Sequence, residues 1–182
     1  MSGMRGLERW LVSEETGESF RHCIQCHLPL LETAGPWLVN KEFRRGECIQ
    51  EYAICQECRD EVTGRFSEES KEAVRLFLET EIDWAARVRD FMMDEDSRFA
   101  ACVACRKPRD EAEGFGISAL FDEGGKPVTG PLPLLVCGSC INRISAALSV
   151  ETRAAWKKFL EDHFPGPPSG EDQGGEGFSG FL

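Results

Sequence analysis

The stretch FRHCIQCHLPL, residues 20–30, places Cys23 and Cys26 in a Cys-x-x-Cys spacing and follows them with His27. Three further pairs with the same spacing occur along the chain. They are Cys55 and Cys58, Cys102 and Cys105, and Cys137 and Cys140. Because 28 residues separate the first two pairs and 31 separate the last two, the cysteines divide the chain into two similar halves.

The residues around the cysteines repeat as well. Phe20 and Phe99 each lie three residues before the first cysteine of their half. After the second pair of each half, the segments FSEESKEAVRLFLE (66–79) and LSVETRAAWKKFLE (148–161) align without a gap. These matches indicate an internal repeat.

Each half predicts the same order of elements and hence an α+β fold. A cysteine knuckle is followed by a β-hairpin, which turns near Arg45-Gly46 in the first half and near Gly124-Gly125 in the second. The second cysteine pair ends the return strand and opens a short helix. A longer helix then begins after Ser67 or Ser149, both good N-cap residues.

Apolar residues at helical spacing predict that the first long helix continues from Glu68 to about Met93. The stripe consists of Val74, Phe77, Leu78, Ile82, Ala85, Val88 and Met92. Near the N-terminus, Leu7, Trp10 and Leu11 predict another short helix. We expect residues 1–82 to form a first repeat, 83–164 a second, and 165–182 a disordered acidic tail rich in Gly and Pro, whose end is apolar.

Two facing Cys-x-x-Cys pairs supply four thiolates, the set that a tetrahedral zinc ion prefers. A duplicated unit should hold its own metal, which favours one site per half over a cross-braced arrangement. We therefore expect two structural Zn²⁺ ions. The predicted ligands are Cys23, Cys26, Cys55 and Cys58 for one ion, and Cys102, Cys105, Cys137 and Cys140 for the other.

A knuckle, a hairpin and a helix that opens with the second cysteine pair resemble the treble-clef group of zinc fingers. The resemblance covers roughly residues 20–66 and 99–148. It implies a fold and a metal, and it implies no particular activity because the group is functionally diverse.

Other chemistries of the cysteines remain open. Cys-x-x-Cys-His is the attachment signature of a c-type haem, but Arg106 stands where a second copy would carry the histidine. Rubredoxin-type iron also uses two such pairs, and thiolate tetrahedra accept either metal. A thioredoxin-like dithiol would need one reactive pair beside a βαβ pattern. Cys48 has no counterpart in the second half, and we expect it to be a buried strand residue.

The formal net charge of −11 disfavours binding to nucleic acid and to anionic membranes. The longest unbroken apolar run, residues 99–105, is far short of the roughly 20 residues that span a bilayer. The N-terminal residues show no apolar segment typical of a signal peptide, so we expect a reducing, cytoplasmic setting.

We expect a non-enzymatic structural-zinc protein that acts as a protein-interaction or adaptor module. No nucleophile and base stand out, because the three histidines either flank a knuckle or end a helix. One alternative is a nucleic-acid-binding zinc finger associated with transcription or translation. Its basic faces would be Lys41, Arg44 and Arg45, or Arg106, Lys107 and Arg109. A further alternative is a zinc-thiolate redox sensor.

Overall fold

Two β-hairpins, one from each repeat, join edge to edge in a single antiparallel sheet. The computed structural model describes residues 6–93 and 95–164. The first repeat contains β1 (Trp37–Arg44), β2 (Glu47–Cys55), α2 (Gln56–Thr63) and α3 (Glu68–Thr80). The second contains β3 (Gly114–Phe121), β4 (Leu134–Cys137), α5 (Gly138–Ala146) and α6 (Val150–His163). The strand order is β2-β1-β3-β4, which confirms the α+β fold class.

Shorter elements complete the fold. They are α1 (Glu8–Leu11), α4 (Trp84–Met93) and the 3-10 turns η1 (Leu30–Glu32), η2 (Glu95–Phe99) and η3 (Arg109–Glu111). The short N-terminal helix is confirmed as α1, and Leu7 and Leu11 are buried. Among the described residues, no helix combines the length and apolar character needed to cross a membrane. The predicted disordered tail, 165–182, lies outside the described residues.

The contact between the repeats is the pairing of β1 with β3. This antiparallel ladder runs without interruption from Trp37 opposite Phe121 to Arg44 opposite Gly114. Near its middle, Ser118 Oγ donates a 2.9 Å hydrogen bond to Asn40 Oδ1, and both side chains are buried. The two repeats therefore share one sheet instead of meeting as separate units.

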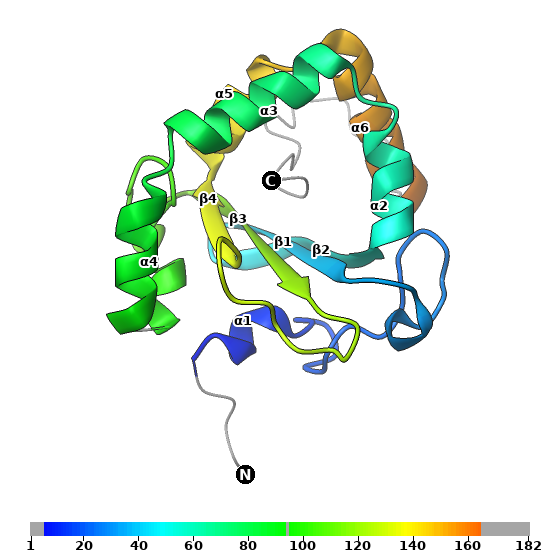
Figure 1. Ribbon diagram of the computed structural model, residues 1–182, viewed down its shortest axis with the longest axis horizontal. Helices are drawn as coiled ribbons and strands as arrows, with labels where there is room; N and C mark the ends of the chain where they lie inside the picture. The colour runs from blue at the N-terminus through cyan, green and yellow to red at the C-terminus, as the bar shows by residue number, and fades with distance from the viewer. Residues whose placement is uncertain (1–5, 94, 165–182) are drawn as a thin grey trace.

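Alternation along the strands gives the sheet two different faces. On one face, the Trp10 ring packs edge-on against Phe43 and Phe115, at 5.8 and 6.5 Å between ring centres. On the other face, Tyr52 packs against Phe159 of α6 at 5.6 Å. Figure 1 shows α1 below the sheet and α2, α3, α5 and α6 arching over the opposite face. We call this second side the helix-covered face.

Both hairpins turn at the glycine-containing positions that the sequence predicts. Arg45 and Gly46 both have positive φ, 51° and 84°, as a two-residue type I′ turn requires. In the second hairpin, Asp122 Oδ1 accepts hydrogen bonds from the backbone of Gly124 and Lys126, each at 2.9 Å. The chain turns here as predicted, and a longer connection then leads to β4.

The prediction of one helix from Glu68 to about Met93 is wrong. The segment is divided into α3 and α4, and Asp83 Oδ1 accepts a 2.9 Å hydrogen bond from the backbone of Ala86 to begin α4. Phe77 and Ile82 of the apolar stripe are buried, but Val88 is 58% exposed. The side chain of Met92 lies outside the described residues. A local cap therefore overrides a continuous helical pattern.

Candidate metal centres

Each repeat brings its four predicted cysteines together. In each group the sulfur atoms lie within 4.8 Å of one another, so each group could hold one metal ion. The two groups are Cys23, Cys26, Cys55 and Cys58, and Cys102, Cys105, Cys137 and Cys140. All nine cysteines are free of disulfide bonds. The grouping within each repeat is the one that the sequence favours, and the cross-braced grouping is not formed.

The spacing of the sulfurs suits a tetrahedral ion. Cys26 Sγ and Cys55 Sγ are 3.9 Å apart, and Cys105 Sγ and Cys137 Sγ are 3.5 Å apart. Metal–sulfur bonds of about 2.3 Å in tetrahedral geometry place the sulfurs about 3.8 Å apart. The donor set and its dimensions therefore fit a four-thiolate metal centre.

The same backbone scaffold positions the sulfurs in both repeats. Cys55 and Cys137 end their strands and stand at the N-caps of α2 and α5. The backbone N–H of Cys55 donates to Cys23 Sγ at 3.5 Å, and that of Cys137 donates to Cys102 Sγ at 3.3 Å. N–H donors and the positive end of a helix both favour the thiolate form of a cysteine.

Further backbone bonds dock each knuckle on its hairpin. Ile24 N donates to Ala53 O, and Val103 N donates to Leu135 O, both at 2.8 Å. These bonds join equivalent places in the two repeats, next to the cysteine ligands. The repeat seen in the sequence is therefore also a repeat in the backbone hydrogen bonds that shape the two centres.

The thiols of the first centre have opposite pKa shifts. Burial raises the pKa of Cys23, but N–H donors from Cys26, Cys55 and Gln25 outweigh it, and the net pKa is lowered. Burial, together with nearby cysteines, raises the pKa of Cys58. One thiolate is thus stabilised by the backbone while its neighbours resist further loss of protons. A divalent cation supplies the positive charge that allows all four sulfurs to ionise.

In the second centre the lowered pKa belongs to Cys105, where backbone and sulfur hydrogen bonds outweigh the effect of burial. Burial, followed by the charge of Cys102, raises the pKa of Cys140. Cys105 is exposed, whereas its equivalent Cys26 is only partly exposed. The two centres share a scaffold but differ in how far solvent reaches one sulfur.

His27 lies outside the set of four sulfurs. It is exposed and has a φ of 62°, and Arg106 at the equivalent position has a φ of 64°. The residue after the second cysteine of each knuckle has a left-handed backbone conformation. Both histidine and arginine adopt this conformation here. The histidine of the haem-like signature therefore stands at a backbone position that the second repeat fills with arginine.

Two arginines near the knuckles are paired with carboxylates. Arg21 pairs with Glu18 at 2.6 Å, and both side chains are exposed. Arg143 pairs with Glu81 at 2.8 Å. That bond, followed by the charge of Cys140, raises the pKa of Arg143. Arg143 thus places a positive charge near the cysteines of the second centre.

Arg59 follows the first centre on α2 and is partly buried. Burial is the main cause of a lowered pKa for its guanidinium group. Its Nε is buried without a hydrogen-bond partner among the described residues. Arg59 therefore differs from the exposed Arg21 and Arg143 in being partly desolvated.

A buried ion cluster surrounds Lys41 and was not predicted from the sequence. The Lys41 side chain is fully buried, and its Nζ donates to Val12 O at 2.7 Å and to Glu14 Oε1 at 2.6 Å. Glu51 Oε2 is 3.8 Å away, and Glu51 also accepts hydrogen bonds from Ser13 Oγ and the backbone of Glu14. The nucleic-acid-binding alternative placed Lys41 on a basic face, but the buried Lys41 side chain is not available to contact phosphate there.

Cys48 was expected to be buried, but it is partly exposed on β2. It lies close to an irregularity in the register of β1 and β2. Its Sγ donates to Gln50 O at 3.5 Å. Burial, followed by the charge of Glu51, raises the pKa of the Cys48 thiol to about 11. The thiol is therefore protonated and weakly nucleophilic at neutral pH.

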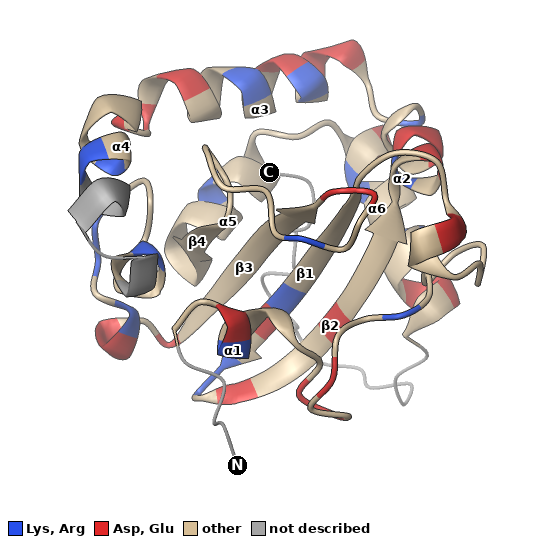
Figure 2. Ribbon diagram, turned by 60° about the horizontal axis from the view of Figure 1, so that its bottom comes forward, with Lys and Arg blue, Asp and Glu red and all other residues tan. Residues whose placement is uncertain are grey.

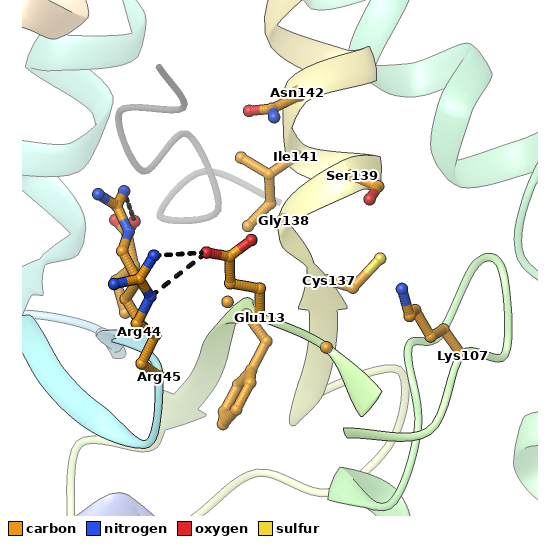
Figure 3. A pocket seen from close by; sticks show the side chains of 13 residues that line it. Arg44, Arg45, Lys107, Glu113, Cys137, Gly138, Ser139, Ile141 and Asn142 are labelled. Carbon is orange, nitrogen blue, oxygen red and sulfur yellow. Dashed lines mark hydrogen bonds and ion pairs between the residues drawn. The ribbon is translucent and has the colours of Figure 1, made fainter. Parts of the chain in front are cut away.

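Two cavities lie near the centres, on opposite faces of the sheet. One, of about 490 Å³, is mainly apolar and is lined by residues that include Leu11, Phe20, Leu31, Trp37 and Phe121. We call it the apolar groove. The other, of about 400 Å³, lies beside Cys137 between the ends of β1 and β3 and the start of α5 (Figure 3). We call it the polar cavity.

Comparison of the chain with known protein families, with curated proteins and with solved structures finds no match. Function must therefore be argued from the two four-sulfur centres and the surfaces around them.

Proposed function

We propose that this chain is a non-enzymatic structural-zinc protein of treble-clef type that acts by binding another protein. The observation that carries the proposal is the pair of four-sulfur groups, each within 4.8 Å. Four protein ligands leave a tetrahedral ion no open position for water or substrate, and such closed sites are structural. The ions would fix the knuckles on the sheet, and the protein surface would bind the partner.

Zinc suits this donor set better than the alternatives do. Three of the four sulfur-bearing residues in each centre are buried, and equivalent backbone donors reach Cys23 and Cys102. Zinc has no redox chemistry of its own and accepts four thiolates without geometric strain. Nine cysteines without disulfides also suit a reducing compartment, so we place the protein in the cytoplasm.

The apolar groove is the surface that best fits a protein partner. Trp37 and Phe121 stack in it with ring centres 5.9 Å apart. Leu31 on its rim is 68% exposed. Exposed apolar side chains beside an apolar groove mark contact sites for other proteins more often than for nucleic acids.

The basic residues offer little to a nucleic acid. Arg44 pairs with Glu42 at 3.6 Å, and Arg45 pairs with Glu113 at 3.2 Å. Arg109 is partly buried, and its guanidinium lies over the Trp10 ring at 4.7 Å. Figure 2 shows Lys and Arg interspersed with Asp and Glu over the described helices and strands. Phosphate binding needs clustered positive charge that is not neutralised by neighbouring carboxylates.

The test is affinity capture with matched surface variants. Leu31 and Val150 are equally exposed, at 68%, but only Leu31 lines the groove. We expect the immobilised wild-type chain and Val150→Glu to retain the same protein from nuclease-treated lysate. Leu31→Glu should retain at least tenfold less while keeping the same zinc content. Equal retention by Leu31→Glu, or capture of nucleic acid that salt releases, would contradict the proposal.

A further inference from the structure

The polar cavity carries an excess of positive charge in an acidic protein. Arg44, Arg45 and Lys107 line it, together with the carboxylates Glu42 and Glu113. Lys107 enters from the side opposite Arg45 (Figure 3). Within residues 6–93 and 95–164, no ion pair to Lys107 is formed, whereas both arginines are paired. The cavity therefore suits a ligand that carries negative charge.

The cavity is also partly apolar. Ile141 contributes an apolar side chain to its lining, and Figure 3 shows it on the first turns of α5. The Phe115 ring packs toward the other face of the sheet, against Trp10. Gly114 and Gly116 are at the start of β3 and present no side chains there. A Cβ on Gly138 would lie 3.4 Å from the Gly114 carbonyl oxygen, so the glycines let the start of α5 lie close to β3 at the edge of the cavity. A ligand that fits should therefore combine acidic groups with an apolar end.

The helix-covered face next to the cavity contains polar groups. Tyr52, Asn40 and Ser118 form one row across β2, β1 and β3, two residues along β1 from Glu42. The hydroxyl of Tyr52 is buried, with the side chain of Asn40 as its polar neighbour. This face therefore presents amide and hydroxyl groups beside the charged side chains of the cavity.

The described chain ends on this same face. Phe164 follows α6 and packs against Tyr52, with 5.9 Å between ring centres. The sequence continues for 18 residues beyond Phe164. An extended segment of that length reaches about 60 Å, whereas four strands span only about 15 Å. The continuing chain can therefore reach the polar cavity.

The sequence of this segment, PGPPSGEDQGGEGFSGFL, matches what the cavity requires. Its charged side chains are all acidic, namely Glu171, Asp172 and Glu176. Phe178, Phe181 and Leu182 make its last residues apolar. Linkage to the same chain also gives such a segment a high effective concentration at the cavity, in the millimolar range or above.

We propose that the C-terminal segment, residues 165–182, docks in the polar cavity of its own chain. Its apolar end lies against Ile141, and its carboxylates face Arg44, Arg45 and Lys107. The segment thus acts as a tethered ligand for a site next to the second metal centre. This inference is independent of the proposed partner, because the apolar groove lies on the other face of the sheet.

Zero-length carbodiimide cross-linking of the full chain tests the proposal, because it joins only amines and carboxylates that touch. We expect a link within one chain from Lys107 to Glu176. Lys157 and Lys158 are the control, since both are exposed and lie close to the segment in sequence. A docked segment should give at least fivefold more of the Lys107 link than of links to these two lysines.

A variant pair provides a second measurement. Phe181→Ser removes an apolar anchor, and Gln173→Ser changes the same segment without removing one. Phe181→Ser should abolish the Lys107 link and raise deuterium uptake severalfold at the start of α5, while zinc content stays unchanged. Gln173→Ser should alter neither. Links confined to Lys157 and Lys158, links only between chains, or unchanged uptake in Phe181→Ser would overturn the proposal.

Discussion

The hydroxyl oxygens of Ser67 and Ser149 lie 2.9 Å apart, although 82 residues separate them in the sequence. Each serine accepts a hydrogen bond from the backbone three residues on, as the N-cap of α3 or α6. Each also donates its backbone N–H to the other repeat, Ser67 to Thr152 Oγ1 at 2.9 Å and Ser149 to Ser70 Oγ at 2.8 Å. Equivalent residues of the two repeats thus meet one another, as equivalent residues do at the interface of a symmetric dimer.

This contact predicts that the two caps do not act independently. Ser67→Ala and Ser149→Ala should each lower the free energy of unfolding by about 2 kcal/mol, because a cap is lost and buried partners lose a bond. The double variant should cost at least 0.5 kcal/mol less than the sum, about the smallest coupling seen for residues in contact. Urea unfolding measures all three. The exposed Ser19→Ala serves as the uncoupled control, and additive Ser67 and Ser149 effects would refute the shared cap.

The buried Lys41 should be the most sensitive lysine in the chain. Lys41→Met removes the cation that Glu14 and Glu51 face, so we expect a loss of about 3 kcal/mol in the free energy of unfolding. Lys71→Met is the matched control, because its pair with Glu68 at 2.7 Å is exposed and worth less than about 0.5 kcal/mol. Equal denaturation midpoints for the two variants would show that the Lys41 cluster contributes nothing.

Local features of the fold could be predicted from the sequence because short-range chemistry determines them. The turn at Arg45-Gly46, the caps at Ser67 and Ser149, and the grouping of cysteines within each repeat all follow from neighbouring residues and spacing. The turn and the caps needed only a few consecutive residues, and the grouping of the cysteines needed the repeat of their spacing along the chain.

Long-range features could not be predicted in this way. The pairing of β1 with β3 joins strands about 80 residues apart, and a hairpin pattern does not reveal which edge finds a partner. From the sequence, Lys41 is predicted to be an exposed strand residue. In the structure it is buried beneath Val12 and Glu14, which are distant in the sequence. The break before α4 depends on one aspartate cap, which the apolar stripe conceals.

The exposed Cys105 predicts that the second centre loses its metal first. Solvent can reach this sulfur, whereas its equivalent Cys26 is better covered. On treatment with a chelator or with mild peroxide, we expect the first ion released to come from the second repeat. Mass spectrometry of trapped cysteines would show modification of Cys105 before Cys26. Simultaneous release from both repeats would contradict this order.

Cys48 provides a test of thiol reactivity. Because burial raises its pKa to about 11, its thiolate fraction at pH 8 is about a hundredfold smaller than that of a cysteine with the ordinary value of 9.0. Iodoacetamide should therefore label the native metal-loaded chain slowly at pH 8, only at Cys48, and faster as the pH rises toward 11. Chelation with denaturation should expose all nine thiols. Rapid labelling of Cys48 at pH 8 would contradict its assigned environment.

Both the stability of the repeats and the proposed function depend on the two proposed four-thiolate zinc centres. X-ray absorption at the zinc edge, combined with elemental analysis of the same sample, measures both the number of ions and their neighbours. We predict two zinc ions per chain, each with four sulfur neighbours at about 2.3 Å. Fewer than two ions per chain, nitrogen or oxygen in the coordination shell, or iron in place of zinc would contradict it.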